Sequence, residues 1–159
     1  MYDVIIKNGK IFDGSGNPWR YGDIGIKDGR IVDIGSLKGV AAAETIDGAC
    51  LAVSPGFIDI FSYYEAGVLE GKLDLSRADQ GITTVLTGNI GISYAPIGKE
   101  YEKELQDYLS FISFSQKDKV SWDWHSMSGF LDYLGKQDSV TNLATMVGHG
   151  VTRMAVMGK

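Results

Sequence analysis

The stretch Ser54-Pro55-Gly56-Phe57-Ile58-Asp59-Ile60-Phe61 decides the fold, because the pattern of the chain changes there. Residues 57–61 form a nearly continuous apolar run, which is typical of a strand buried on both faces of a parallel sheet. Residues 82–86 and 142–147 have the same character. Apolar residues at helical spacing predict helices over residues 69–80, 99–112 and 126–134, the last with Ser126 as its N-cap. Strands that alternate with helices in this way indicate βαβ units.

Upstream of this stretch, the chain has the turn signals of short antiparallel strands. Asn8-Gly9 and Asp28-Gly29 are strong hairpin signals, and residues 44–47 and 50–53 predict two more strands joined across Gly48. The expected fold class is therefore α/β, with an antiparallel β-sandwich portion over residues 1–54. The first part of a TIM-like (β/α) barrel is expected over residues 55–159. The barrel is expected to be incomplete, since a typical one has about 250 residues.

Composition excludes several classes of function. Fifteen basic and 20 acidic residues give a net charge of −5, which disfavours binding to nucleic acid or to an anionic membrane. No apolar run reaches the about 18 residues that span a bilayer, and the N-terminus has no signal-peptide pattern. Cys50 is the only cysteine, which fits a reducing compartment. We therefore expect a cytoplasmic protein without a membrane or nucleic-acid partner.

The motifs follow a recognisable order. Asp3-Val4-Ile5-Ile6-Lys7-Asn8-Gly9 resembles the opening of many amidohydrolases, and Pro55-Gly56-Phe57-Ile58-Asp59 resembles the start of their first barrel strand. The loop Gly88-Asn89-Ile90-Gly91 and the motif Gly148-His149-Gly150 with Arg153 are similar to the N-acyl-D-amino-acid deacylase (D-aminoacylase) branch. The resemblance covers nearly the whole chain. It implies the N-terminal portion of a zinc-dependent amide (C–N) hydrolase.

The same resemblance implies that the metal site is lost. In this family a His-x-His pair follows the first-strand motif, and a cysteine stands in the loop after the next strand. Residues i and i+2 of a strand point to the same side, so that two imidazoles converge on one metal. The corresponding residues here are Phe61, Tyr63 and Ile90. Phenyl and aliphatic side chains have no donor atom, and a tyrosine ligates only as a phenolate. We therefore expect no cofactor and no activity of this chain alone.

Other polar residues remain candidates for a site. Asp59, Glu65 and His149 still carry donor atoms, which leaves a replacement metal site as an alternative. Simpler interpretations are loop hydrogen bonds for Asp59, solvation for Glu65 and a place at a strand end for His149. Trp122, Trp124 and His125 form a cluster that is more typical of packing than of ligand binding.

Substrate binding, by resemblance, falls to loops after the presumed barrel strands, where ligands bind in this architecture. The candidate residues are Gly88, Asn89, His149 and Arg153. The guanidinium of Arg153 suits a substrate carboxylate, and the alternative is that it pairs with a surface acid.

Three functional hypotheses follow. The first is a truncated or degenerate deacylase without activity. The second is a scaffold subunit of a split amide hydrolase whose remaining barrel comes from a complementing chain. The third is a non-enzymatic binding module. Open sheet edges favour pairing with a second copy or with a complementing chain.

Overall fold

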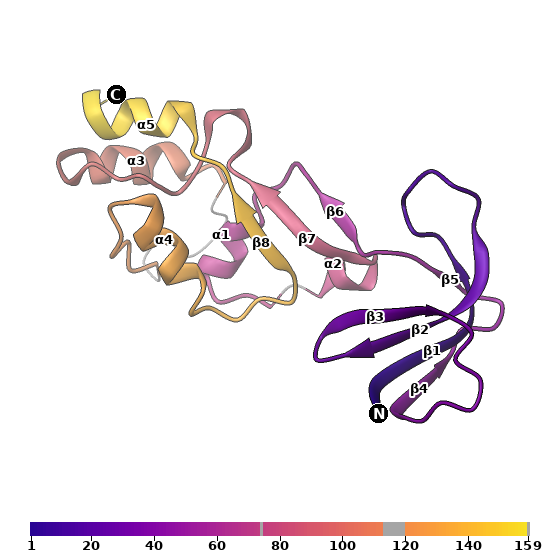
Figure 1. Cartoon of the computed structure of the whole chain (residues 1–159). Helices are drawn as coiled ribbons and strands as arrows, with labels where there is room; N and C mark the ends of the chain where they lie inside the picture. Colours follow the sequence, from indigo (N-terminus) through magenta and orange to yellow (C-terminus); the bar gives the residue numbers. More distant parts are fainter. Residues whose placement is uncertain (74, 113–119, 159) are drawn as a thin grey trace. The chain divides into compact units, whose positions relative to one another are not determined.

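The computed structural model describes residues 1–73, 75–112 and 120–158 (Figure 1). The chain divides into two compact units, Met1–Pro55 and Gly56–Lys159, and each unit is described by itself. No helix of the described residues is long and apolar enough to cross a bilayer.

The first unit is a single five-stranded sheet. Its strands are β1 (Tyr2–Ile11), β2 (Arg20–Lys27), β3 (Arg30–Gly35), β4 (Ala42–Asp47) and β5 (Ala52–Val53). The order is β3-β2-β1-β4, and β5 also pairs with β1. β1–β2 and β2–β3 are antiparallel, whereas β4 and β5 both lie parallel to β1. The two strands expected on either side of Gly48 are present. The sheet is nevertheless mixed, so the expectation of an antiparallel module is wrong for the pairing of β4 and β5 with β1.

The mixed order arises because the chain crosses from the β3 edge to the opposite side of β1. Asp23 on β2 holds this crossing in place. Its carboxylate accepts hydrogen bonds from the backbone N–H groups of Asn8, at 2.9 Å, and of Leu37, at 2.7 Å. These two bonds hold the pKa of the Asp23 carboxyl below its usual range. One buried carboxylate thus fixes both the crossing segment and β1.

The two expected hairpin turns have different outcomes. Asp28 and Gly29 have φ values of 51° and 70° and connect β2 to β3, as predicted. Asn8 also has a positive φ, 60°, but it lies inside β1, where the pairing register with β2 shifts between Ile6 and Gly9. The Asn8-Gly9 pair is therefore a β-bulge. The bulge removes the Asn8 backbone N–H from the hydrogen-bond ladder, and the Asp23 carboxylate accepts a hydrogen bond from this N–H instead.

One face of this sheet is aliphatic. The register places Val4 beside Ile26 and Ile26 beside Ile31, and it aligns Ile6 with both Ile24 and Ile46. Ile34, which pairs with Ile24, extends the face to the edge strand. Ile31, Ile34 and Ile46 are 61%, 44% and 42% exposed. This aliphatic face is the side on which a second sheet would pack in a β-sandwich.

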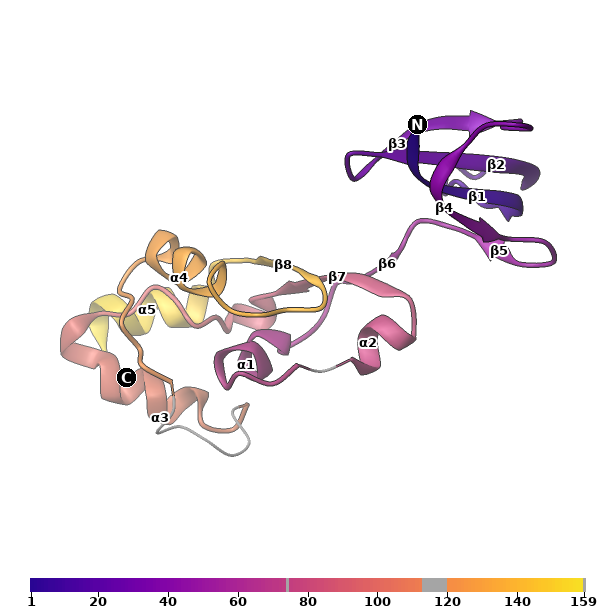
Figure 2. The same ribbon diagram turned by 90° about the horizontal axis from the view of Figure 1, so that it is seen from below.

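The second unit is built on a parallel sheet of order β6-β7-β8. Its strands are β6 (Phe57–Asp59), β7 (Ile82–Thr87) and β8 (Asn142–Thr145), and its α-helices are α1 (Tyr64–Leu69), α2 (Ser76–Asp79), α3 (Glu102–Leu109), α4 (Met127–Leu134) and α5 (His149–Met157). Two 3-10 turns, η1 (Asn89–Gly91) and η2 (Lys99–Tyr101), complete it. This alternation confirms the α/β prediction. Seen from below, α3, α4 and α5 lie beyond the carboxyl end of β7, and α2 lies near its amino end (Figure 2).

The helix predictions are confirmed in part. α4 begins after Ser126, whose hydroxyl accepts a hydrogen bond from the Gly129 backbone N–H. The helix expected over residues 69–80 is wrong, because two short helices, α1 and α2, take its place. Gly71, at a φ of 69°, turns the chain after α1, and the backbone N–H of Lys72 bonds to the carbonyl of Gly67. This geometry ends a helix. The helix expected over residues 99–112 is shorter, because η2 replaces its first turn.

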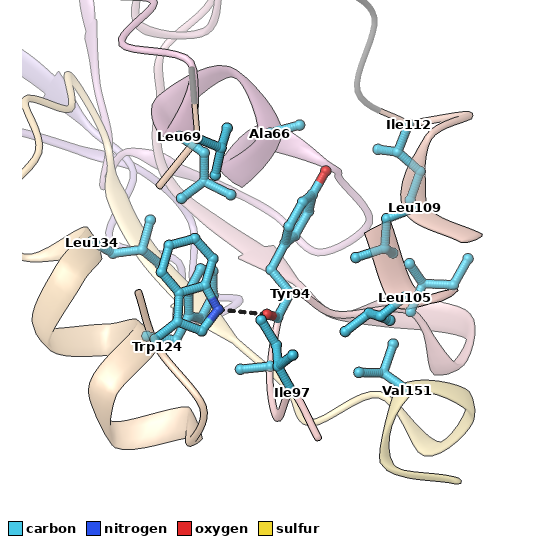
Figure 3. Packing of buried hydrophobic residues seen from close by; sticks show 14 of the residues in the cluster. Ala66, Leu69, Tyr94, Ile97, Leu105, Leu109, Ile112, Trp124, Leu134 and Val151 are labelled. Carbon is cyan, nitrogen blue, oxygen red and sulfur yellow. Dashed lines mark hydrogen bonds between the residues drawn. The ribbon is translucent and has the colours of Figure 1, made fainter. Parts of the chain in front are cut away.

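The core of the second unit gathers around Tyr94 (Figure 3). The Trp124 indole N–H donates to the Tyr94 backbone carbonyl at 2.7 Å, and the Tyr94 ring stacks on Trp122 and Phe130. The interpretation of Trp122 and Trp124 as packing residues is confirmed. His125 is exposed, and its carbonyl accepts a bond from the Ile97 N–H.

The strand after Gly56 differs from its prediction. β6 has only three residues, and Phe57, Ile58, Ile60 and Phe61 are exposed rather than buried on both faces. The reason is that β6 is an edge strand, and no described element covers these side chains. The apolar run therefore corresponds to an exposed hydrophobic surface rather than to a strand buried on both faces.

The Ser126 cap provides a test of α4. Replacing Ser126 by alanine should lower the free energy of unfolding by about 1 kcal/mol, because the Gly129 N–H loses its acceptor. Ser128→Ala, at an exposed position inside the same helix, is the matched control and should change stability by only a few tenths of a kcal/mol. Urea unfolding followed by tryptophan fluorescence measures both. Equal effects of the two substitutions would contradict the assigned cap.

Candidate functional site

The candidate site lies where the three parallel strands end. β6 leads through residues 60–63 into α1, β7 leads into the η1 turn, and β8 leads through residues 146–148 into α5. The Asn89 side-chain amide joins two of these ends, because it donates to the carbonyls of Ile60, at 3.0 Å, and Leu86, at 3.2 Å. Asn89 is therefore a positioning residue of the strand ends in this chain.

Two glycines bring the third strand end against the second. Gly88 has a φ of 78°, and a Cβ there would lie 2.2 Å from the Met146 carbonyl oxygen. A Cβ on Gly148 would lie 2.6 Å from the Gly91 carbonyl oxygen. No side chain fits at either position. The loops after β7 and β8 are thus packed backbone to backbone.

Phe61, Tyr63 and Ile90, at which the family resemblance places metal ligands, lie at this edge. Phe61 and Ile90 are 57% and 68% exposed, and the Phe61 and Tyr63 ring centroids are 6.1 Å apart. Neither Phe61 nor Ile90 has a lone pair. Ile90 has a φ of 51°, a rare conformation for a β-branched residue. The loop thus keeps a strained backbone at the position where the family resemblance places a cysteine ligand.

The remaining donors do not form a replacement metal site. Within the described ranges, no three His, Cys, Asp or Glu side chains converge on one point. Asp59 makes the expected loop hydrogen bond, from the Phe61 N–H at 3.1 Å, and lies 3.9 Å from the Arg77 guanidinium. The donor set therefore does not fit zinc.

Glu65 contradicts its prediction. It was expected in solvent, but it is 1% exposed, and its Oε2 has no hydrogen-bond partner in the structure. Burial, opposed by hydrogen bonds from its own backbone and from Thr87, raises the pKa of this carboxyl to about 7. The sequence did hold a signal. Glu65 is the only charged residue of the otherwise apolar stretch Tyr64–Leu69, and such a stretch is more often packed inside than solvated.

His149 and Arg153 lie elsewhere than expected. Both belong to α5 rather than to a loop, and both are exposed. The chain turns into a helix directly after Gly148, which is the N-cap residue. Arg153 lines a shallow hollow of about 320 Å³ with Tyr108, Gly150, Met154 and Gly158. The structure thus places Gly88 and Asn89 at the strand ends and Arg153 on a helix surface; a role in substrate binding stays a prediction for all four residues.

Comparison with known proteins agrees with this geometry. The chain is 35% identical to a D-aminoacylase of Alcaligenes xylosoxydans xylosoxydans, over 98% of its own length and 31% of that protein. It is also 35% identical to an N-acyl-D-aspartate deacylase of the same organism, over 98% of its length and 30% of that protein. The chain is related to the N-terminal portion of the N-acyl-D-amino-acid deacylases of the amidohydrolase superfamily.

Solved structures show the same relationship. A D-aminoacylase crystal structure superposes with a TM-score of 0.77 and 32% identity, over 100% of this chain and 32% of that one. An N-acyl-D-glutamate deacylase from Bordetella bronchiseptica, solved with zinc and a phosphonate inhibitor, gives a TM-score of 0.73 and 31% identity, over 99% and 32%. No family model matches. This deacylase-like chain thus spans about a third of the length of these relatives.

The close approach of Gly88 to Met146 can be tested by substitution. Gly88→Ala should lower the free energy of unfolding by about 3 kcal/mol or more, because its Cβ collides with backbone atoms. Gly71→Ala is the matched control: Gly71 also has a positive φ, but a Cβ there meets no atom within 4 Å. It should cost about 1 kcal/mol, from backbone strain alone. Urea midpoints that fall equally for both variants would show that the Met146 contact is unimportant.

Proposed function

We propose that this protein is a deacylase-like amidohydrolase polypeptide that holds no zinc at the family's position and hydrolyses no N-acyl amino acid on its own. The observation that carries the proposal is the identity of Phe61, Tyr63 and Ile90 at the ends of β6 and β7. In this family the metal would polarise a carbonyl group and activate a water molecule. Two side chains without donor atoms and one neutral phenol do not form a zinc site, so these positions supply neither effect.

The other described residues do not replace that chemistry. Asp59 is engaged by the Phe61 N–H and by Arg77. Glu65 is enclosed in the core of the unit, where neither water nor a substrate can reach it. A general base must come within about 3 Å of the proton that it removes. The described strand ends therefore support a binding surface better than a reaction centre.

A second candidate function, that of a scaffold subunit, is favoured by the uncovered surfaces. β6 and β8 are both edge strands of a three-stranded sheet, and the exposed side chains of Phe57, Ile58 and Ile60 lie along the β6 edge. Open edges and apolar patches of this kind favour association. The exposed aliphatic face of the first unit likewise favours association with a partner. A complementing polypeptide that supplies further barrel strands would satisfy these surfaces.

Metal analysis and hydrolysis assays test the first proposal. Purified protein incubated with zinc and then desalted should retain much less than one zinc per chain, and it should not hydrolyse N-acetyl-D-amino acids. The triple variant Phe61→His, Tyr63→His, Ile90→Cys should bind zinc more tightly but still show no turnover, since the described residues supply no base beside that position. Stoichiometric zinc in the unmodified chain, or turnover by it, would refute the proposal. Turnover by the triple variant would instead show that these three side chains alone account for the inactivity.

Co-expression tests the scaffold function. The partner is the unmatched remainder of the Alcaligenes D-aminoacylase, about two thirds of that protein. A complex with this chain should co-purify, and Ile58→Lys with Ile60→Lys should abolish it because charges replace the apolar edge. Leu131→Lys, at an exposed position on α4, is the control and should leave the complex intact. Sedimentation as separate monomers would speak against a scaffold role.

A further inference from the structure

Glu65 belongs to a buried polar cluster that the proposed function does not use. Glu65 lies on α1, Thr87 ends β7, and Tyr94 follows the η1 turn; these residues are 1%, 0% and 2% exposed. Figure 3 shows the Tyr94 hydroxyl directed toward α1, near Ala66. The Oε2 atom of Glu65 and the hydroxyls of Tyr94 and Tyr64 lack hydrogen-bond partners in the structure. Buried polar atoms without partners are rare and costly.

Among the described residues, no neighbouring positive charge shifts the pKa of Glu65. Glu70, at the end of α1, forms an ion pair with Lys72. Arg77 on α2 lies 3.2 Å from the Ser62 hydroxyl, 3.9 Å from Asp59 and 4.8 Å from the centre of the Tyr64 ring. The effects on the pKa of Glu65 are burial, its own backbone N–H and the Thr87 side chain. Among the described groups, none places a positive charge against it.

The element that carries Glu65 is a short helix. α1 has six residues, and no side chain caps its N-terminus. It is held by Tyr64, Ala66, Val68 and Leu69, which belong to the core. A carboxylate enclosed among these side chains is costly, and its charge can regain water only if α1 moves away from the core. Local opening of one short helix costs less than unfolding the whole unit.

We propose that α1 is a pH-sensitive segment, which packs on the core while Glu65 is neutral and is released when Glu65 loses its proton. In the closed state α1 packs on the core, and in the opened state it is released. The neutral acid stabilises the closed state, and this stabilisation is complete below the pKa that Glu65 has in the opened state. It is lost as the pH rises through the pKa of the closed state, which burial places at about 7. The opened state has the ordinary value of 4.5. The opening equilibrium should therefore rise about tenfold between pH 6 and pH 8.5.

Hydrogen–deuterium exchange of the full chain tests this device. After correction for the intrinsic pH dependence of exchange, peptides over residues 62–72 should lose about tenfold of their protection between pH 6 and pH 8.5. Peptides from β7 and α5 should change much less. Glu65→Gln should remove the pH dependence of the α1 peptides, and Glu65→Met should do the same if the glutamine variant is unstable.

Glu70→Gln is the matched control, because Glu70 is a buried carboxylate of the same segment that has a cationic partner. It should keep the pH dependence of the unmodified chain. Unchanged α1 protection from pH 6 to pH 8.5, or a pH dependence that persists in both Glu65 variants, would overturn the proposal. An equal loss of protection in α1, β7 and α5 would also overturn it, because the transition would then be global.

Discussion

The side-chain amide of Asn89 ties the ends of two parallel strands together, and the arrangement of the second unit depends on this constraint. The side-chain amide group donates to the carbonyls of Ile60 and Leu86, which lie where the β6–β7 ladder stops. Gly88 then lets the end of β8 approach without a side chain between them. The geometry of all three strand ends therefore rests on one amide and on two glycines, Gly88 and Gly148, where no side chain fits.

This backbone frame is independent of the metal chemistry that the family resemblance implies. Gly88, Asn89 and Gly91 keep the loop in shape through hydrogen bonds and close backbone contacts, and none of these contacts needs a ligand at Ile90. The left-handed conformation of Ile90 is a cost that the frame imposes on whichever residue stands there. The shape of this loop thus does not depend on the chemistry of the side chain at position 90.

Elements that depend on hydrogen bonds between residues close in sequence could be predicted from the sequence. Elements that depend on contacts with distant residues could not. Asp28-Gly29 and Ser126 act through bonds within a few residues, so their turn and cap could be predicted. Asn8-Gly9 has the same turn signal, but Asp23, fifteen residues away, converts it to a bulge. The predicted helix over residues 69–80 passed over Gly71, whose positive φ turns the chain after α1.

The candidate site was predicted in outline only. The strand-end position of Asn89 followed from the alternation of strands and helices. The burial of Glu65 and the helical position of His149 and Arg153 did not, because each depends on how a helix packs after its strand. In the same way, the apolar run at Phe57 predicted a strand correctly but could not reveal that no described element covers its side chains.

The mixed order of the first sheet has a consequence for how that unit folds. β1, β2 and β3 can pair through short connections, but β4 and β5 reach β1 only after the chain has crossed the sheet, about forty residues from their partners. Distant pairings of this kind form late, because the chain loses the conformational entropy of loop closure before the stabilising contacts between the strands can form. During that interval β1 presents an unpaired edge beside an aliphatic face. Newly made chains are therefore expected to be most prone to aggregate before β4 docks.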